Sequence, residues 1–358
     1  MKLIVQPADG VALVAKAIRQ AKKSIEIVIF RFDQAEIERA LVEAAQRGVI
    51  VHALIAFTNR GGEKNLRKLE MRFLEEGITV ARTADDLSRY HGKMMVVDGK
   101  ELLLLTYNFT HLDTERTRSF GVVTGNRELV REASRLFECD TKRQAYKSRS
   151  DKLVVSPANS RLRLLAFIKG AKSELLIYDP DLTDKEILRA LEDRCQAGVN
   201  VRIIGRMSRS RHLAARRLRR MRLHTRVVIR DCRQAFMGSQ SLRKMELDTR
   251  REIGIIVNNA KVVSSLVTVF EDDWKASANQ SEEKKHVGAR AERVSRKVTK
   301  VVGKKAAPAP VVQRVLKVIQ REASVAVDSR QAAQVVQGAF KKAVRKATAQ
   351  IVQKSMAN

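Results

Sequence analysis

The hydrophobic and polar positions of this chain repeat one local pattern at two places. The segment at 21–32, AKKSIEIVIFRF, has the apolar run of a buried strand, and the segment at 171–182, AKSELLIYDPDL, has the same character. Each is followed by apolar positions at helical spacing, a glycine (Gly48 or Gly198) and a second apolar run. This order predicts a strand, a helix and a strand, a βαβ unit, in two copies about 150 residues apart.

The later parts of the two copies align at a different offset, about 133 residues, which carries His91 onto His224. The same offset carries Gly121 onto Gly254, and the register holds for about fifty positions. The change of offset means that the first copy has roughly 17 additional residues between its βαβ unit and His91. A register kept over such a length predicts an internal duplication.

The pattern divides the chain into three parts. Residues 1–147 and 148–280 each hold one copy, which predicts an α/β protein of two tandem domains, with mixed sheets flanked by helices. In residues 281–358 basic residues outnumber acidic ones by about 18 to 5, and the segment GKKAAPAP at 303–310 is typical of an extended linker. The rest of this tail favours basic helices, either a solvated extension or an arm that binds nucleic acid.

Composition limits the setting in which the protein works. The 358 residues include 70 Lys and Arg against 40 Asp and Glu, and the net charge of +30 predicts a polyanionic partner such as nucleic acid or an anionic membrane surface. Three cysteines, Cys139, Cys195 and Cys232, are far apart and predict neither a metal site nor a disulfide framework. The cysteines favour a reducing, cytoplasmic setting, and the lack of an apolar run of membrane length predicts no membrane span. We expect no cofactor.

The segment HGKMMVVD at 91–98 carries polar residues at the ends of an apolar strand. Asp98 and Gly99 form a favourable two-residue hairpin turn, which pairs positions whose numbers sum to 197. Because side chains alternate along strands, this register predicts that four polar residues share one face. These residues are His91, Lys93, Thr106 and Asn108.

The second copy repeats this arrangement in HTRVVIRD at 224–231. With Asp231 and Cys232 as the turn, four residues again share one face. They are His224, Arg226, Ser239 and Ser241. Arginine therefore stands where the first copy has lysine, and serine stands where it has asparagine.

The carboxylates near these strands are expected to have different roles. Asp98 and Asp231 lie seven positions beyond their histidines, roughly 20 Å along a strand, so we expect turn formers or structural acceptors, not catalytic bases. Glu252 follows in the second copy, where the first copy has Ser119. A carboxylate beside a histidine orients the ring and keeps it basic, so Glu252 could hold the imidazole of either copy.

These duplicated residues resemble the phospholipase D superfamily over about residues 5–277. His91-x-Lys93-x4-Asp98 matches the family's motif, and the second motif matches it except that Arg226 replaces the lysine. The resemblance implies that the two motifs meet at a pseudo-twofold interface and form one site. It implies metal-independent hydrolysis or transfer of phosphodiesters through a phosphohistidine.

The resemblance also implies roles for the residues. By analogy His91 is the nucleophile and His224 the general acid and base, and the sequence itself allows the reverse. A further set is expected to bind the phosphate, by charge or by hydrogen bonds. These residues are Lys93, Thr106, Asn108, Arg226, Ser239 and Ser241. The other histidines have no such support and are expected to be ordinary surface or packing residues: His52, His111, His212 and His286.

The leading functional prediction is a phosphodiesterase that acts on nucleic acid. The run from Arg206 to Arg222 leads into the second motif and is either a solvated helix with an arginine face or a contact surface for phosphates. Aromatic residues form 4% of the chain, which favours contact with the backbone over base stacking. Two alternatives stay open: hydrolysis or transfer of an anionic phospholipid, and a nucleic-acid-binding protein that has lost turnover.

Overall fold

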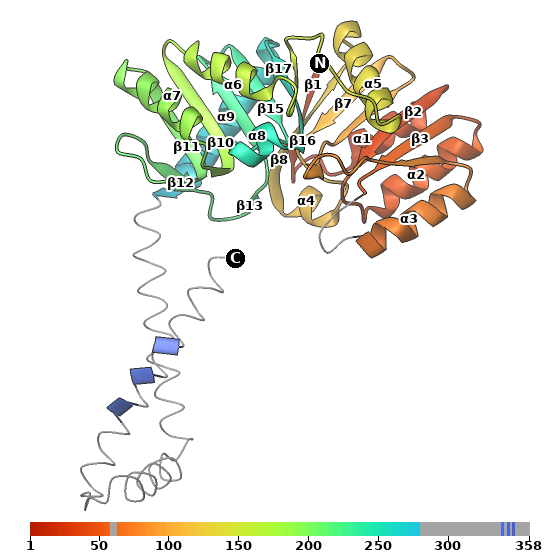
Figure 1. Cartoon of the computed structure of the whole chain (residues 1–358), viewed down its shortest axis with the longest axis horizontal. Helices are drawn as coiled ribbons and strands as arrows, with labels where there is room; N and C mark the ends of the chain where they lie inside the picture. Colours follow the sequence, from red (N-terminus) through yellow and green to blue (C-terminus); the bar gives the residue numbers. More distant parts are fainter. Residues whose placement is uncertain (58–62, 280–337, 340–341, 344–345, 348–358) are drawn as a thin grey trace, which may run out of the picture. The chain divides into compact units, whose positions relative to one another are not determined.

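The structure is a computed structural model that describes residues 1–57, 63–279, 338–339, 342–343 and 346–347 (Figure 1). Met1–Ala278 form one compact unit, and both copies of the sequence pattern lie within it. The predicted linker and nearly all of the predicted tail helices lie outside the described residues.

The first repeat contains the predicted strand, helix and strand, preceded by one further strand and helix. Its elements are β1 Lys2–Gln6, α1 Ala12–Gln20, β2 Ser24–Ile29, α2 Ala35–Gln46, β3 Ile50–Ile55, α3 Glu63–Glu75, β4 Thr79–Arg82, β5 Arg89–Tyr90, β6 Met94–Val97, β7 Glu101–Leu105, α4 His111–Glu115, β8 Thr117–Thr124 and α5 Arg127–Thr141. The additional residues of this copy form α3 and its connections.

The second repeat follows in the same order without a counterpart of α3. Its elements are β9 Leu153–Val155, α6 Ser160–Lys169, β10 Glu174–Leu182, α7 Lys185–Gln196, β11 Asn200–Met207, β12 Ala215–Arg217, β13 Arg222–Leu223, β14 Arg226–Arg230, β15 Gln234–Gly238, α8 Lys244–Asp248, β16 Arg250–Arg251, β17 Ile253–Val257, α9 Ala260–Ala276 and β18 Ala278–Asn279. The run from Arg206 to Arg222 is not the helix that was one alternative, because β12, β13 and the turns between them occupy it.

Strand order confirms the duplication. The first sheet runs β1-β8-β7-β6-β2-β3-β4, and the second runs β9-β17-β15-β14-β10-β11-β12, with β18 at its edge. In both, the βαβ strands pair in parallel and the strands of the histidine hairpin pair antiparallel. The prediction of mixed sheets in an α/β fold is therefore confirmed.

A shared core joins the two sheets. Apolar side chains of α5 and α9 lie in one buried cluster with residues from the facing sides of both sheets, whereas the outer helices of each repeat cover separate clusters. In β6, Met94 and Val96 point into the shared cluster and Met95 and Val97 into the outer cluster of the first repeat. Both faces of the strand are thus buried, which explains its unbroken apolar sequence.

The predicted register of both hairpins is wrong by one position. Met94 pairs with Leu104, and Val97 with Glu101, so paired numbers in the strands sum to 198. The predicted turn at Asp98 and Gly99 is nevertheless present, since both residues have positive φ and the N–H of Lys100 donates to the carbonyl of Val97 at 2.9 Å. The second hairpin pairs Arg226 with Gly238 and likewise keeps its turn at Asp231 and Cys232. His91 is therefore not opposite Thr106, and His224 is not opposite Ser239.

Candidate active site

Each histidine follows a short strand that pairs with the other repeat. β5, just before His91, pairs with β16 of the second repeat, and the N–H of His91 donates to the carbonyl of Arg251 at 2.7 Å. β13, just before His224, pairs with β8 of the first repeat. This reciprocal pairing brings the two histidines together, and their ring centroids lie 6.4 Å apart.

A carboxylate lies at the Nδ1 side of each imidazole. Glu252 Oε2 lies 2.8 Å from His91 Nδ1, so the second repeat supplies the carboxylate for the histidine of the first. Asp113 Oδ2 lies 3.5 Å from His224 Nδ1, which has no hydrogen-bond partner within the described residues. Phe30 also packs its ring against that of His91, at 4.5 Å between centroids. His91 is thus more firmly oriented than His224.

Lys93 and Arg226 occupy equivalent positions and make equivalent contacts. Lys93 Nζ donates to the carbonyl of His91 at 2.7 Å and lies 2.9 Å from His91 Nε2. Arg226 Nη1 donates to the carbonyl of His224 at 2.6 Å, and its Nε donates to Ser241 Oγ at 2.9 Å. A cation therefore lies beside each histidine: Arg226 lines a cleft where it can meet a bound anion, whereas Lys93 is buried and does not line that cleft.

Burial controls the charges of these groups. It is the main cause that lowers the pKa of His91 and His224 well below the usual value, and the positive charges of Lys93 and Arg226 lower it further. Burial also lowers the pKa of Lys93 to about 7, against the opposing effect of Glu252, and it raises the pKa of Glu252 itself. Both imidazoles are therefore neutral at pH 7 before a substrate adds negative charge.

The polar residues of the hairpins have two different positions. Asn108 and Ser241 line a cleft at the histidines. Thr106 and Ser239 are fully buried and lie outside its lining, because their hydroxyls bond to the backbone of the next strand, at Phe120 and Ile253. This placement does not support their predicted phosphate contact.

Asp98 and Asp231 lie at the hairpin loops, far from the histidines along their strands. The carboxylate of Asp98 accepts hydrogen bonds from the backbone N–H groups of Lys22, Lys23 and Ser24. Asp231 accepts the equivalent three at Lys172, Ser173 and Glu174. These contacts hold the hairpin to the start of the βαβ unit, which is the structural role expected of both aspartates.

The cleft at the histidines has a volume of about 500 Å³ and is lined by both repeats. Phe30 is the only Phe, Tyr or Trp side chain among its described lining residues. Seven arginines line it: Arg31, Arg89, Arg206, Arg222, Arg226, Arg243 and Arg250. The described lining also includes four carboxylates, which the arginines outnumber: Asp33, Asp113, Asp181 and Glu246.

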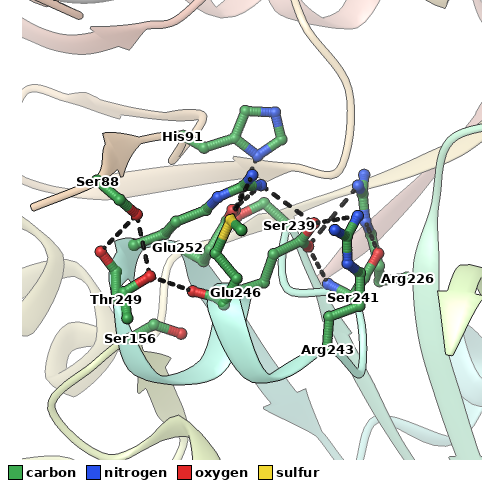
Figure 2. Close-up of polar contacts among 12 residues, drawn as sticks. Ser88, His91, Ser156, Arg226, Ser239, Ser241, Arg243, Glu246, Thr249 and Glu252 are labelled. Carbon is green, nitrogen blue, oxygen red and sulfur yellow. Dashed lines mark hydrogen bonds and ion pairs between the residues drawn. The ribbon is translucent and has the colours of Figure 1, made fainter. Parts of the chain in front are cut away.

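None of these carboxylates was identified from the sequence, and two of them contact polar residues of the hairpins. Asp113 accepts from the backbone and side-chain nitrogens of Asn108, at 2.9 and 2.7 Å, and pairs with Arg222 at 2.6 Å. Glu246 accepts from the backbone of Ser241 at 2.6 Å, and Figure 2 shows it among neighbouring arginines. The offset of 133 carries Asp113 onto Glu246, so the duplication itself could have identified them.

The remaining histidines lie apart from the cleft or at its margin. His52 contacts Phe137, His111 is exposed beside Glu115, and His212 is exposed, whereas His286 lies outside the described residues. Within the described ranges, no three His, Cys, Asp or Glu side chains form a group that could hold a metal ion. None of the helices in that part of the chain is long and apolar enough to cross a lipid bilayer.

Comparison with known proteins identifies a family that covers both repeats. The family model "Cardiolipin synthase, PLD-like domain" matches residues 14–141 and 164–274, one match in each repeat and together more than half of the chain. The chain belongs to this phospholipase D-like family. The two matches coincide with the two repeats, of which the first carries His91 and the second His224.

Several relatives of this phospholipase D-like chain are named polyphosphate kinases. The one from Synechocystis is 26% identical over 200 residues, which cover 51% of this chain and 27% of that protein. The solved polyphosphate kinase from Porphyromonas gingivalis has a TM-score of 0.64 at 21% identity and covers 76% of this chain and 50% of that one. The phosphatidylserine synthase structure from Haemophilus influenzae has a TM-score of 0.60 at 12% identity and covers 78% and 87%. The chain thus spans only about a quarter to a half of the polyphosphate kinases.

Proposed function

We propose that the protein is a metal-independent phosphodiesterase that cleaves nucleic acid through a phosphohistidine. The observation that carries the proposal is the pair of histidines, 6.4 Å apart between ring centroids, in a cleft lined by seven arginines. Two imidazoles on either side of one phosphate can supply a nucleophile and a proton donor together.

His91 is the better nucleophile. Its Nδ1 donates to the carboxylate of Glu252, which leaves the lone pair on Nε2, and its low pKa keeps the ring neutral. His224 has no such bond at Nδ1 and faces Asp113 at 3.5 Å. It can therefore take up a proton when the substrate's charge raises its pKa.

The reaction then has two steps. His91 Nε2 attacks phosphorus, the bond to the leaving oxygen breaks, and His224 gives that oxygen a proton. Water next attacks the phosphohistidine and gives a proton to His224, and the P–N bond breaks. Lys93 and Arg226 neutralise the non-bridging oxygens as charge develops, with Asn108 as a further hydrogen-bond donor.

The arginines favour nucleic acid as the substrate. Besides those in the cleft, several arginines of the segment between β11 and β14 are exposed: Arg209, Arg211, Arg219 and Arg220. Together they extend the positive surface beyond the length of one phosphate, as binding to a polyanionic backbone requires. The small aromatic content of the cleft favours binding without sequence preference.

A second candidate is phosphoryl transfer to or from inorganic polyphosphate. The names of the relatives favour it, and a chain of phosphates without bases suits a cleft that has many arginines and one aromatic ring. The histidine chemistry would be similar, but the bond broken would be a phosphoanhydride.

The test uses the full chain and five substrates: single-stranded DNA, duplex DNA, RNA, polyphosphate and vesicles of anionic phospholipid. Each is offered with and without EDTA to the wild type, to His91→Ala and to the matched control His212→Ala, which replaces an exposed histidine. We expect nucleic acid to be cleaved in EDTA by the wild type and the control but not by His91→Ala. Cleavage that persists in His91→Ala, or turnover of polyphosphate or lipid alone, contradicts the proposal.

A further inference from the structure

A second hollow lies in the first repeat, apart from the histidines. It has a volume of about 1070 Å³ and is lined by α5, β2, β3 and the loop between β6 and β7. It shares no lining residue with the histidine cleft. The chemistry proposed above makes no use of it.

The duplication supplies an internal comparison for this hollow. The register of β2 with β3 equals that of β10 with β11, so each position can be matched to its counterpart. Three of the positions that differ lie around the interior of the hollow, with the residue of the first repeat given first: Glu26 and Leu176, His52 and Arg202, Thr141 and Trp274.

In the second repeat the counterpart residues fill the space. The guanidinium of Arg202 lies 5.6 Å from the ring centroids of both Phe270 and Trp274. It also forms ion pairs with Glu174 and Glu271. A large stacked side chain and its ion pairs therefore occupy the position that stays open in the first repeat.

In the first repeat the replacements leave polar groups around the open space. Thr141 takes the place of the indole, and its buried hydroxyl has no hydrogen-bond partner among the described residues. The Glu26 carboxylate accepts from Ser134 Oγ at 2.7 Å, and burial raises its pKa. His52 lies with its ring edge against Phe137, with centroids 5.1 Å apart. The hollow thus combines an apolar floor with unused hydrogen-bonding capacity.

Positive charge at the margin is also special to the first repeat. Arg127 and Arg131 are exposed on α5 at the hollow, whereas α9 has Ala260 and Ser264 in their places. In the part of the chain that the structure describes, neither guanidinium forms an ion pair or a hydrogen bond. Both can therefore meet an anion, and paired arginines suit a phosphate.

We propose that this hollow binds a mononucleotide. Its phosphate lies at Arg127 and Arg131, its base lies by His52 and Phe137, and Glu26 accepts hydrogen bonds from the base or sugar. The volume is of the size that small-molecule sites have. The proposal does not depend on the activity proposed for the histidines, because the two sites share no residue.

Calorimetry on the full chain tests it, with AMP as the probe and ribose 5-phosphate and inorganic phosphate as its parts. Thr141→Trp and Arg131→Ser each install the residue of the second repeat, and Arg222→Ala is the control in the histidine cleft. We expect Thr141→Trp to weaken AMP binding by at least about tenfold and Arg131→Ser by about three- to tenfold, whereas Arg222→Ala leaves it unchanged.

The proposal is overturned by the absence of AMP binding at millimolar concentration, by equal AMP affinity in wild type and Thr141→Trp, or by loss of AMP binding in Arg222→Ala. Inorganic phosphate that binds as tightly as AMP would also overturn it, because the site would then recognise only an anion. If Thr141→Trp fails to fold, Arg131→Ser serves as the test, because Arg131 is exposed. An AMP affinity of Arg131→Ser equal to that of wild type would then contradict the proposal. Phosphodiester turnover, measured in parallel, should be unchanged in Thr141→Trp and Arg131→Ser.

Discussion

Replacing Glu252 by glutamine should disable the histidine that the geometry favours as nucleophile. Glu252 is fully buried, and its Oε2 lies 2.8 Å from His91 Nδ1. A hydrogen bond to a charged group is worth roughly 1.5–3 kcal/mol, which corresponds to a loss of about 10- to 150-fold in rate. A glutamine amide can also donate to Nδ1 and so place the ring proton on Nε2, where it blocks attack, and a wrong tautomer costs up to about 10⁴-fold.

We therefore expect kcat of Glu252→Gln to fall by about 10- to 10⁴-fold with little change in KM, since Glu252 does not line the cleft. The assay is hydrolysis of a chromogenic phosphodiester, with single-turnover trapping of the phosphoenzyme. Glu115→Gln, an exposed carboxylate beside His111, is the matched control. A Glu252→Gln enzyme that folds and retains kcat within about threefold of wild type would refute the assignment of Glu252 to His91.

Three further predictions rest on the charges of the molecule. Because the pKa of Lys93 is about 7, its ammonium is lost as pH rises through that value, so kcat/KM of the wild type should fall above about pH 7. In Lys93→Arg the decrease of kcat/KM at high pH should begin about two pH units higher or more. A decrease at the same pH as in wild type would mean that another group titrates. Asp98→Asn should lower the free energy of unfolding by about 1–3 kcal/mol at pH 7 and leave kcat unchanged. Backbone hydrogen bonds hold the pKa of Asp98 below its usual value, so the stabilisation by its carboxylate is present above the unfolded-state pKa. The difference in thermal unfolding between Asp98→Asn and wild type should therefore vanish as pH falls through the folded-state pKa. Loss of turnover per folded molecule would instead give Asp98 a catalytic role. Combined Arg219→Ala and Arg220→Ala should reduce the slope of log affinity for DNA against log salt by about one for each of these arginines that neutralises a phosphate, and an identical slope would remove both from the interface.

Local sequence determined the elements and the duplication. Apolar runs and helical spacing are properties of neighbouring residues, and Gly48 and Gly198, with φ of 85° and 86°, end their helices in the left-handed conformation that glycine adopts without strain. The motif around His91 and its second copy were visible for the same reason. These features need no knowledge of contacts between distant residues.

The turn residues alone did not determine the hairpin register. Asp98 and Gly99 have positive φ, as a two-residue turn needs. The carboxylate of Asp98, however, is bonded to backbone groups at Lys22, Lys23 and Ser24, more than 70 residues earlier. That contact attaches the hairpin loop to the start of β2, and the spacing of residues along the strand does not predict it.

The pairing of the carboxylates with the histidines was also decided by the tertiary structure. The sequence identified Glu252 as a partner for an imidazole on either copy. The parallel pairing of β5 with β16 brings Glu252 to His91, 161 residues away, while the pairing of β13 with β8 places His224 near Asp113. Periodicity along the sequence predicts which residues share a face of a strand. Only the pairing of strands between the two repeats determines which faces meet, and this pairing gives the two histidines different carboxylate partners.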